Sequence, residues 1–373
     1  MKKIRQIIGY FIMAALPCLT VACGSDDTAK DGKLELKASA AQIVADGADY
    51  VTFTVLSGGQ DVTSSAEIYK GTARLEGAKF TSDEEGTFRF TAKYQGALSN
   101  DVEVKVVAPA KYKKKAILPV WSSVNCIWCP KMAEQLKNVW QAERPGQTVP
   151  MYFHSKLGAD DDDPFIVLDK NGKILEGNMA VWFNCIGGLP KAAIDAVTTI
   201  NYTDGSDRLD IALQRPTYTG IAIETSLDGN TLKVKVRTKA DQDYKYPAGL
   251  TIWLIENGLV SPQQKGEEVP GQDEPKVEVI EDYVHNYVVR AGLCEEYTGI
   301  AIPEASAKAG QEYTYETTYV IPAEYKKENL CVVAYVYQNV PKAVSQSQHQ
   351  VENVQEVKAG QSIGYELTNG NKE

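Results

Sequence analysis

The chain has 373 residues, a formal net charge of -10 and 43% hydrophobic residues. This acidic balance argues against nucleic acid and anionic lipid headgroups as partners, because their phosphate groups would repel the chain. The length predicts two or three domains of ordinary size. No glycine-rich phosphate-binding loop occurs, and we expect no cofactor.

The first residues predict an export signal. Three basic residues among the first five precede a short apolar run at residues 7–19, which is too short to span a bilayer comfortably and is typical of a signal peptide. Residues 1–22 form the predicted signal peptide, and a small residue followed by Cys23 indicates a lipoprotein cleavage site. Acylation of Cys23 would anchor the chain, since two or more acyl chains at one residue bind a membrane stably.

Residues 23–32 are the predicted lipidated tether. Its acidic start at residues 24–27 favours an outer membrane lipoprotein that faces the cell exterior, with the periplasmic face as the alternative. An ordinary secretory peptide before an incidental cysteine is the alternative to lipidation. No other segment is apolar and long enough to cross a bilayer.

Residues 33–108 predict an immunoglobulin-like β-sandwich. Apolar and polar residues alternate in short runs at residues 87–91 and 102–106, and glycine-rich turns separate such runs. No catalytic constellation occurs in this segment, and we interpret it as a spacer. The basic run at residues 111–115 is interpreted as a linker with solvated charges.

Residues 112–212 predict a thioredoxin-like α/β domain. A strand-like run at residues 116–121 leads into Cys126-Ile127-Trp128-Cys129-Pro130, and the apolar residues that follow lie on one face of a helix. Further strands are predicted at residues 149–154 and 192–194. A strand, a Cys-x-x-Cys, a helix and a strand in this order are typical of thioredoxin.

The Cys-x-x-Cys pair predicts thiol–disulfide chemistry. Cys126 would lie at the start of the helix, where unpaired backbone N–H groups favour a thiolate. This setting lowers the pKa of a cysteine thiol from its ordinary value of about 8.5. We assign Cys126 as the attacking nucleophile and Cys129 as the resolving thiol. The alternative is a local disulfide with a structural role only.

A proline turn is expected beside the cysteines, because thioredoxin folds pair a substrate peptide with the backbone at a cis-proline. Leu189-Pro190 and Asp163-Pro164 are the two candidates. The first is favoured, since it precedes a predicted strand and follows a Gly-Gly turn. Leu189, Pro190 and Trp128 are therefore the predicted substrate-binding residues.

Residues 216–368 predict a second β-sandwich, in which alternating residues at 231–238 form one of several strands. Cys294 and Cys331 lie in this part, and we expect them to form a structural disulfide in an oxidising compartment. Cys185 is then the odd thiol, either buried or able to exchange with the Cys-x-x-Cys pair.

Several segments resemble the outer membrane protein Omp28 family, a group of bacterial envelope lipoproteins. The resemblance covers roughly residues 115–345, and it rests on the Cys-x-x-Cys-Pro segment, Gly188-Leu189-Pro190, Ile255-Glu256-Asn257-Gly258-Leu259-Val260, Tyr319-Val320-Ile321-Pro322-Ala323-Glu324-Tyr325 and, most specifically, the segment at residues 280–290. It implies a thioredoxin-like domain followed by a β-sandwich in an envelope protein. Because the proteins of this family are known mainly by their location, the resemblance implies where the chain is found and does not imply an activity.

The chain departs from the family pattern close to the cysteines. Asn125 stands where the family usually has Trp, and Ser123 replaces a usual Gly. Pro119 and Val120 occupy positions that are acidic in the family. A buried carboxylate there would accept the proton of Cys129, so its loss bears on turnover.

No metal site is predicted. A zinc site built from the Cys-x-x-Cys pair, Cys185 and His154 lacks the second half of a paired motif, and the acidic run at residues 160–163 lacks EF-hand spacing. His285 sits in a strand-like, tyrosine-rich segment and is expected to be a structural histidine.

Two functions fit these observations. The first is a thiol–disulfide oxidoreductase that acts on exported thiol or disulfide proteins at the envelope. The second is a non-enzymatic surface lipoprotein for binding or adhesion, in which the thioredoxin fold is a scaffold and Cys126–Cys129 is structural. Both predict the same architecture, so architecture alone does not separate them.

Overall fold

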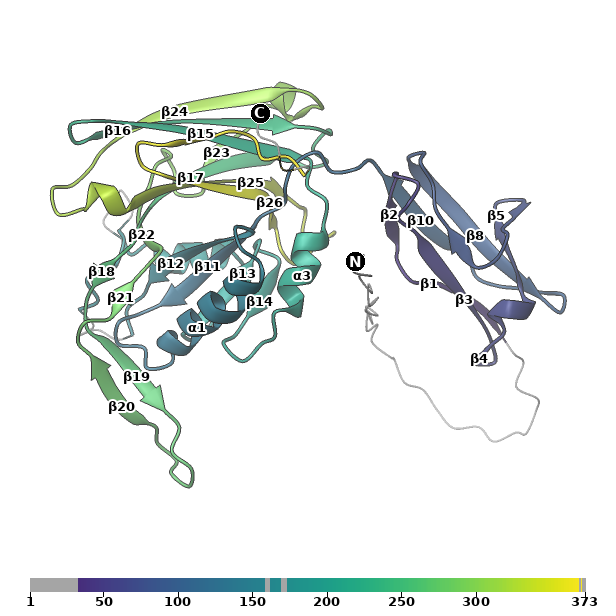
Figure 1. Cartoon of the computed structure of the whole chain (residues 1–373), viewed down its shortest axis with the longest axis horizontal. Helices are drawn as coiled ribbons and strands as arrows, with labels where there is room; N and C mark the ends of the chain where they lie inside the picture. The colour runs from purple at the N-terminus through teal and green to yellow at the C-terminus, as the bar shows by residue number, and fades with distance from the viewer. Residues whose placement is uncertain (1–32, 158–161, 169–172, 369, 371–373) are drawn as a thin grey trace, which may run out of the picture. The chain divides into compact units, whose positions relative to one another are not determined.

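The structure is a computed structural model that describes residues 33–157, 162–168, 173–368 and 370. The chain divides into two compact units, Met1–Pro109 and Ala110–Glu373 (Figure 1). The predicted signal peptide, Cys23 and the tether lie outside the described residues. In the part of the chain that is described, no helix combines the length and the hydropathy needed to cross a bilayer.

The first unit is a sandwich of two β-sheets. One sheet has the order β1–β3–β4, with β7 also on β3, and the other has the order β2–β10–β8–β5–β6, with β9 also on β8. The strands, and one 3-10 turn, are β1 (Leu34–Ala38), β2 (Gln42–Val44), β3 (Val51–Ser57), β4 (Gln60–Asp61), η1 (Thr63–Ser65), β5 (Glu67–Lys70), β6 (Ala73–Arg74), β7 (Lys79–Phe80), β8 (Gly86–Tyr94), β9 (Ala97–Leu98) and β10 (Val102–Val107).

Alternation of apolar and polar residues forms the core of this sandwich. Val51, Phe53 and Val55 on β3 are buried, while the threonines between them are not. Phe53 packs against Phe90 of the facing sheet, with ring centroids 4.6 Å apart. Because strand residues point alternately to opposite faces, this pattern covers one face of each sheet and leaves the other in water. The architecture agrees with the sandwich predicted for residues 33–108.

The second unit contains the remaining strands and all three α-helices of the described residues. Its elements are β11 (Ala116–Ser122), α1 (Cys129–Gln135), the π-helical turn η2 (Leu136–Gln141), β12 (Thr148–His154), α2 (Glu176–Trp182), β13 (Lys191–Ile194), β14 (Thr198–Ile200), α3 (Asp207–Gln214), β15 (Thr219–Asp228), β16 (Thr231–Ala240), β17 (Ala248–Glu256), β18 (Leu259–Val260), β19 (Gln263–Glu267), β20 (Lys276–Ile280), β21 (Val284–His285), β22 (Val288–Gly292), β23 (Ile300–Ala301), η3 (Glu304–Ala307), β24 (Glu312–Val320), η4 (Lys327–Asn329), β25 (Leu330–Asn339), β26 (His349–Lys358) and β27 (Ser362–Ile363).

A nine-stranded mixed sheet runs through this unit in the order β14–β13–β11–β12–β22–β17–β25–β26, with β23 also on β17. β11 is parallel to β12 and antiparallel to β13. β12 is joined to β22 at the pair Tyr152–Val288. The predicted division between residues 112–212 and 216–368 therefore does not appear as two compact units, because this junction merges both stretches into one sheet.

Both faces of the nine-stranded sheet are covered. On one face, α2 packs over alternate residues of β11, β12, β17 and β25, among them Trp121, Phe153 and Trp253. On the other face, α1 and α3 cover β11, β13 and β14, with Met132, Leu136 and Trp140 buried at helical spacing; this is the apolar helix face predicted from the sequence.

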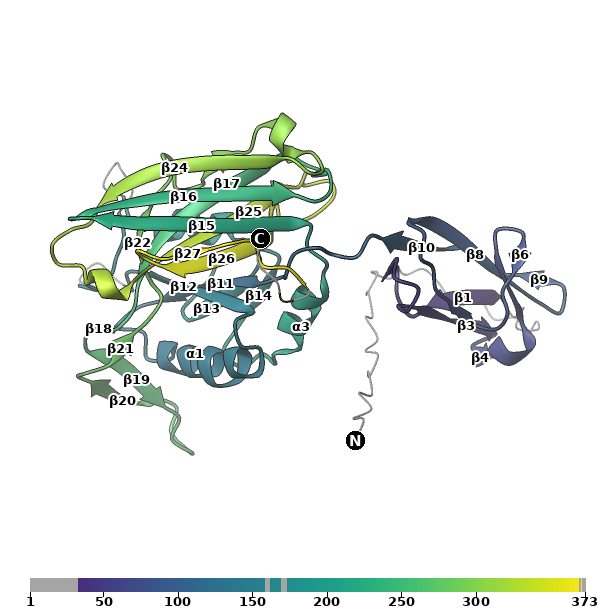
Figure 2. The ribbon, with the colours of Figure 1, turned by 45° about the horizontal axis from the view of Figure 1, so that its top comes forward.

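A second sheet completes the sandwich predicted for the C-terminal part. It has the order β24–β16–β15–β27, and its apolar face packs on β17 and β25 (Figure 2). Val234 and Val236 of β16 meet Ile252 and Leu254 of β17 in this core. α1, α3 and the second sheet thus lie on one face of the large sheet, and α2 lies on the other face.

The basic run at residues 111–115 is not the solvated linker that was expected. Lys114 and Lys115 are 9% and 8% exposed. Lys114 Nζ lies 2.8 Å from Asp195 Oδ2, and Lys115 forms an ion pair with Glu366. Asp195 also accepts hydrogen bonds from Arg215 at 2.7 Å and from the Ile117 N–H at 3.0 Å. Burial of a charge is costly unless it is paired, which explains this network.

Removing the charge of Asp195 should destabilise the second unit strongly. Burial lowers the pKa of Lys114, and Asp195 is the main group that opposes this effect. Asp195→Asn keeps the shape and tolerates the positive φ of 52° at this position, but it leaves Lys114 without its counter-charge. We expect a loss of about 3 kcal/mol in the free energy of unfolding, measured by urea denaturation. Asp228→Asn, which breaks an exposed ion pair with Lys233, should leave the midpoint unchanged.

Candidate functional site

The candidate site lies where β11 ends and α1 begins. The loop at residues 123–128 follows Ser122, and α1 starts at Cys129 with Pro130 in its first turn, where a proline is tolerated. Cys126 and Cys129 form a disulfide with their Cα atoms 5.4 Å apart. Cys126 is 4% exposed and Cys129 is 3% exposed, so the disulfide is buried.

The favoured proline lies beside this loop. β13 pairs with β11 through Ala192–Val120 and Lys191–Trp121, and continuing this register by one residue brings Pro190 opposite Ser122. The Leu189–Pro190 peptide bond is cis. Pro190 is buried, and Leu189 is partly buried against the core that contains Trp121. The two candidate segments, the Cys-x-x-Cys loop and the Leu189-Pro190 turn, therefore lie side by side where β11 ends and β13 begins.

Trp128 points toward a different neighbour. Its ring stacks on that of Tyr202, with centroids 6.3 Å apart and planes 13° from parallel, and the ammonium of Lys131 lies 4.3 Å from the Trp128 ring centroid. Trp128 thus contacts the segment after β14. Its predicted role in binding substrate stays a prediction.

A β-hairpin from the second half of the chain covers the Cys-x-x-Cys loop. In Figures 1 and 2 the hairpin of β19 and β20 projects from the unit next to the start of α1. The Gln264 N–H donates to the Val124 carbonyl and the Gly266 N–H donates to the Ile127 carbonyl, both at 2.8 Å. A Cβ atom at Gly266 would lie 3.2 Å from the side chain of Ile127, so glycine permits this close contact.

Gln263 fastens the hairpin to the loop. Its side chain is buried, and Nε2 lies 3.0–3.1 Å from the carbonyl oxygens of Ser123, Val124 and Cys126. Buried carbonyl groups need donors, and the two N–H bonds of this amide are shared among these three carbonyls. The loop that carries Cys126 is thereby held closed on this side.

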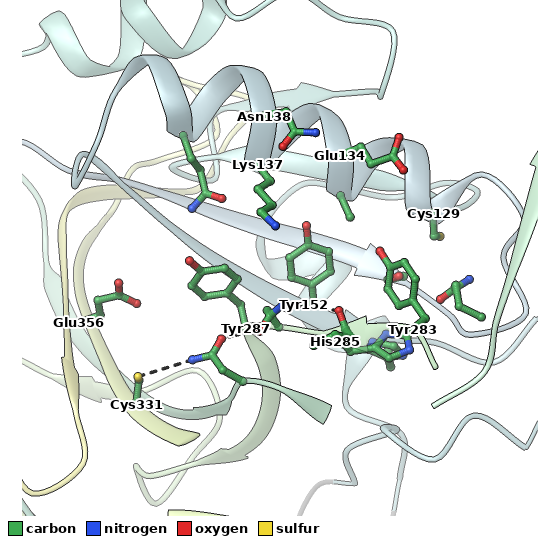
Figure 3. A pocket seen from close by; sticks show the side chains of 18 residues that line it. Cys129, Glu134, Lys137, Asn138, Tyr152, Tyr283, His285, Tyr287, Cys331 and Glu356 are labelled. Carbon is green, nitrogen blue, oxygen red and sulfur yellow. Dashed lines mark hydrogen bonds between the residues drawn. The ribbon is translucent and has the colours of Figure 1, made fainter. Parts of the chain in front are cut away.

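A cavity of about 600 Å³ opens beside Cys129, between the helix and the sheet. Its wall on the helix side comes from α1 and η2, and its floor comes from β12 and from the strap at residues 283–287 (Figure 3). Tyr152, Tyr283 and Tyr287 form a row in Figure 3 with their hydroxyl groups turned toward the helix. Lys137 points down toward this row from the helix.

The cavity walls carry few charges. Burial raises the pKa values of Tyr152, Tyr283 and Tyr287, so the phenols are neutral at physiological pH. Burial also raises the pKa of Glu356, although Lys115 opposes this shift. The walls therefore offer hydroxyl and amide groups around aromatic rings.

A buried His–Asp pair lies under the Cys-x-x-Cys loop. His154 Nδ1 and Asp163 Oδ2 are 2.8 Å apart, and Asp163 also accepts hydrogen bonds from the Val124 and Phe165 N–H groups, each at 2.9 Å. Burial opposes ionisation of Asp163, but these hydrogen bonds, with His154 the strongest, hold the pKa of its carboxyl below the ordinary range. The pair holds the loop in place through the Val124 N–H. Asp163, which the sequence analysis considered as part of a calcium-binding run, is occupied by these hydrogen bonds.

The predicted disulfide between Cys294 and Cys331 is wrong. Both thiols are free, as is that of Cys185. Cys331 packs against the core on one face of the large sheet and Cys294 against the core on the other face, so the sheet itself separates them. A disulfide needs Cα atoms within about 7 Å and side chains that face each other.

Cys185 is buried in the core covered by α2. Burial raises the pKa of its thiol to about 12, with Lys191 opposing the shift. A thiol in this state is almost wholly protonated at neutral pH and is a poor nucleophile. This argues against exchange between Cys185 and the Cys-x-x-Cys pair.

Residues 182–362 match the family model of outer membrane protein Omp28. Over this segment the chain is similar to the Omp28 family. The resemblance inferred from the sequence is thereby confirmed over these residues, and the similarity points to an outer membrane location. The matched residues include the hairpin and the strap that form the cavity, but not the Cys-x-x-Cys motif.

The fold has a counterpart among solved structures. HBP35 of Porphyromonas gingivalis is similar with a TM-score of 0.50 and 15% sequence identity, over 67% of this chain and 76% of that protein. At this identity the similarity concerns the fold alone. No curated protein sequence matches the chain.

The strap histidine gives this site a measurable pH dependence. Burial and the neighbouring His154 lower the pKa of His285 to about 4, although the Ser261 carbonyl opposes the shift. Between its ordinary value of about 6.5 and about 4, the unfolded chain binds a proton that the folded chain does not, so stability falls as the pH is lowered through this range. NMR titration should place the His285 midpoint below 5. His285→Gln should reduce the loss of unfolding free energy between pH 7 and 4.5 by up to about 3 kcal/mol. An unchanged pH dependence would contradict the buried, neutral imidazole.

Proposed function

We propose that the chain is an outer membrane lipoprotein that carries out thiol–disulfide exchange through Cys126 and Cys129. The observation that carries this proposal is the disulfide between β11 and α1, with the Leu189-Pro190 turn beside it. In the proposal, residues 112–212 act as a thioredoxin-like module. Strands in the order β14–β13–β11–β12, with α1 directly after the cysteine loop, support this interpretation.

The chemistry follows from the reactivity of sulfur. A thiolate of the partner attacks one sulfur of the disulfide, a mixed disulfide forms, and the second cysteine leaves as a thiolate. β11 carries Pro119 and Val120 where a carboxylate would accept a proton. Without that base we expect the exchange reaction to occur but to turn over slowly, since thiol–disulfide exchange does not require a separate base.

This proposal predicts exchange activity that depends on both cysteines. The purified chain should accelerate exchange between reduced glutathione and a model disulfide by at least about tenfold over the uncatalysed rate, read by absorbance. Cys126→Ser combined with Cys129→Ser should abolish the acceleration. Cys185→Ser removes only a buried, protonated thiol and should retain it.

The alternative is a binding or adhesion lipoprotein in which the Cys126–Cys129 bond is structural. Burial of the disulfide under the β19–β20 hairpin favours this alternative. The same assay separates the two functions. If the chain accelerates exchange of neither a protein disulfide nor a small disulfide, the redox proposal is wrong and the binding or adhesion function is adopted in its place.

We further propose that the chain is anchored through acylated Cys23 and faces the cell exterior. The predicted signal peptide ends at the residue before Cys23, and the similarity of residues 182–362 to the Omp28 family supports an outer membrane location. In the native host, metabolic labelling with a fatty acid should mark the protein. Cys23→Ser should lose the label and move the protein from the membrane pellet to the soluble fraction. Cys18→Ser, at the other cysteine of the leader, should keep both the fatty-acid label and the location in the membrane pellet.

A further inference from the structure

The two sulfurs of the disulfide have different surroundings. On the side of Cys126, β19 forms backbone hydrogen bonds with the loop, and the Gln263 amide lies 3.1 Å from the Cys126 carbonyl oxygen. Cys129 instead lines the cavity of about 600 Å³, and Cys126 is not among the lining residues. In Figure 3 the Cys129 side chain descends from the start of the helix near Tyr283.

A folded protein does not fit the approach that remains open. Substrate proteins of a thioredoxin-like site need an exposed edge around the first cysteine, and here β19 occupies it. The cavity has the size of a small-molecule pocket, which typically measures about 300–1,000 Å³. The cavity is therefore an approach to the disulfide, at Cys129, for molecules of that size.

We propose that the exchange partner is a low-molecular-weight thiol or disulfide that enters this cavity and reacts at Cys129. This inference rests on the proposed exchange function. This reverses the order of attack expected from the sequence, in which Cys126 reacts first. Cys126 becomes the leaving group of the first step.

The reaction balances with two molecules of the small thiol. The thiolate RS⁻ attacks Cys129 Sγ, the Cys126–Cys129 bond breaks, an R–S–Sγ bond to Cys129 forms, and Cys126 leaves as a thiolate that takes a proton from water. A second thiolate attacks the sulfur of R in this mixed disulfide, which releases RSSR and leaves Cys129 reduced. Two thiols are oxidised and one protein disulfide is reduced; the reverse direction oxidises the protein.

The cavity walls define the chemistry of the small molecule. Phenol groups from Tyr152, Tyr283 and Tyr287 and amides from Asn138, Gln141 and Asn257 offer many hydrogen bonds. The charged lining groups are one lysine, Lys137, and two carboxyls, Glu134 and Glu356. Because this set lacks an excess of cations, a multiply charged anion is disfavoured. The walls fit a polar thiol of low net charge, with amide or hydroxyl groups along its body.

Two backbone irregularities occur in these walls. The helix changes from α to π geometry at η2, which supplies Lys137, Asn138 and Gln141 to the cavity. Tyr287, on the opposite wall, has a φ of 57°. π-helical turns and left-handed non-glycine residues cost free energy and are concentrated at binding sites.

The test compares the two thiols one at a time. Cys126→Ser and Cys129→Ser are made in a Cys331→Ser background, because Cys331 lines the same cavity. Each variant is exposed to bis(2-hydroxyethyl) disulfide, which is uncharged. Adducts are timed by mass spectrometry and located by peptide mapping, and pH–rate profiles correct for the pKa of each thiol. Ala133→Phe, one helical turn after Cys129 on the cavity wall, blocks the approach. Gln135→Phe, on the same helix but outside the cavity, is the matched control.

We expect the Cys129 thiol to react at least about tenfold faster than the Cys126 thiol after correction for thiolate fraction. Ala133→Phe should slow the Cys129 reaction by a similar factor, and Gln135→Phe should leave it within about twofold. Faster reaction at Cys126, or no effect of Ala133→Phe, overturns this inference while the proposed exchange function stands. If neither thiol forms an adduct and the unmodified chain catalyses no exchange, both proposals fall.

Discussion

The single strand pairing between β12 and β22 determines the rest of the second unit. Tyr152 pairs with Val288, and the Tyr152 N–H donates to the Tyr287 carbonyl at 2.8 Å. This junction joins the strands next to the cysteines with those of the second half in one sheet. It also sets the strap at residues 283–287 along the floor of the cavity, and with it the hairpin that leads back over the Cys-x-x-Cys loop. The disulfide therefore lies beside a cavity whose walls come from both halves of the unit.

Local patterns predicted the local parts of this structure. The spacing of apolar residues predicted the buried face of α1 at Met132, Leu136 and Trp140, and the Cys-x-x-Cys motif located the disulfide. Pro190, which stands between a Gly-Gly turn and a predicted strand, was preferred over Pro164, and β13 begins at the next residue. These features depend on neighbours a few residues away, so a single sequence carries them.

Features that depend on distant residues were missed. Gln263 lies 137 positions from Cys126, and its hydrogen bond to that loop leaves no trace in either local sequence. The cavity is likewise assembled from α1, β12, the strap and β26, so no single motif marks it. Cys294 and Cys331 were paired because both lie in one predicted sandwich. The sequence predicts the strand on or near which each cysteine lies, but not the face of the sheet to which its side chain points. That face decides whether the two sulfurs can touch.

The beginning and the end of the second unit are bonded side by side, and this has a mechanical consequence. Tyr112 bridges to Thr217 and Leu367, and the Lys113 N–H donates to the Glu366 carbonyl at 2.8 Å. A chain held at its N-terminal end transmits any tension into this unit through residue 110. That load falls first on the contacts of residues 112–115 with the C-terminal segment and with Asp195. The stretch that holds the disulfide lies beyond these contacts, so a pull from the N-terminal side leaves the loop with Cys126 unstrained until they break.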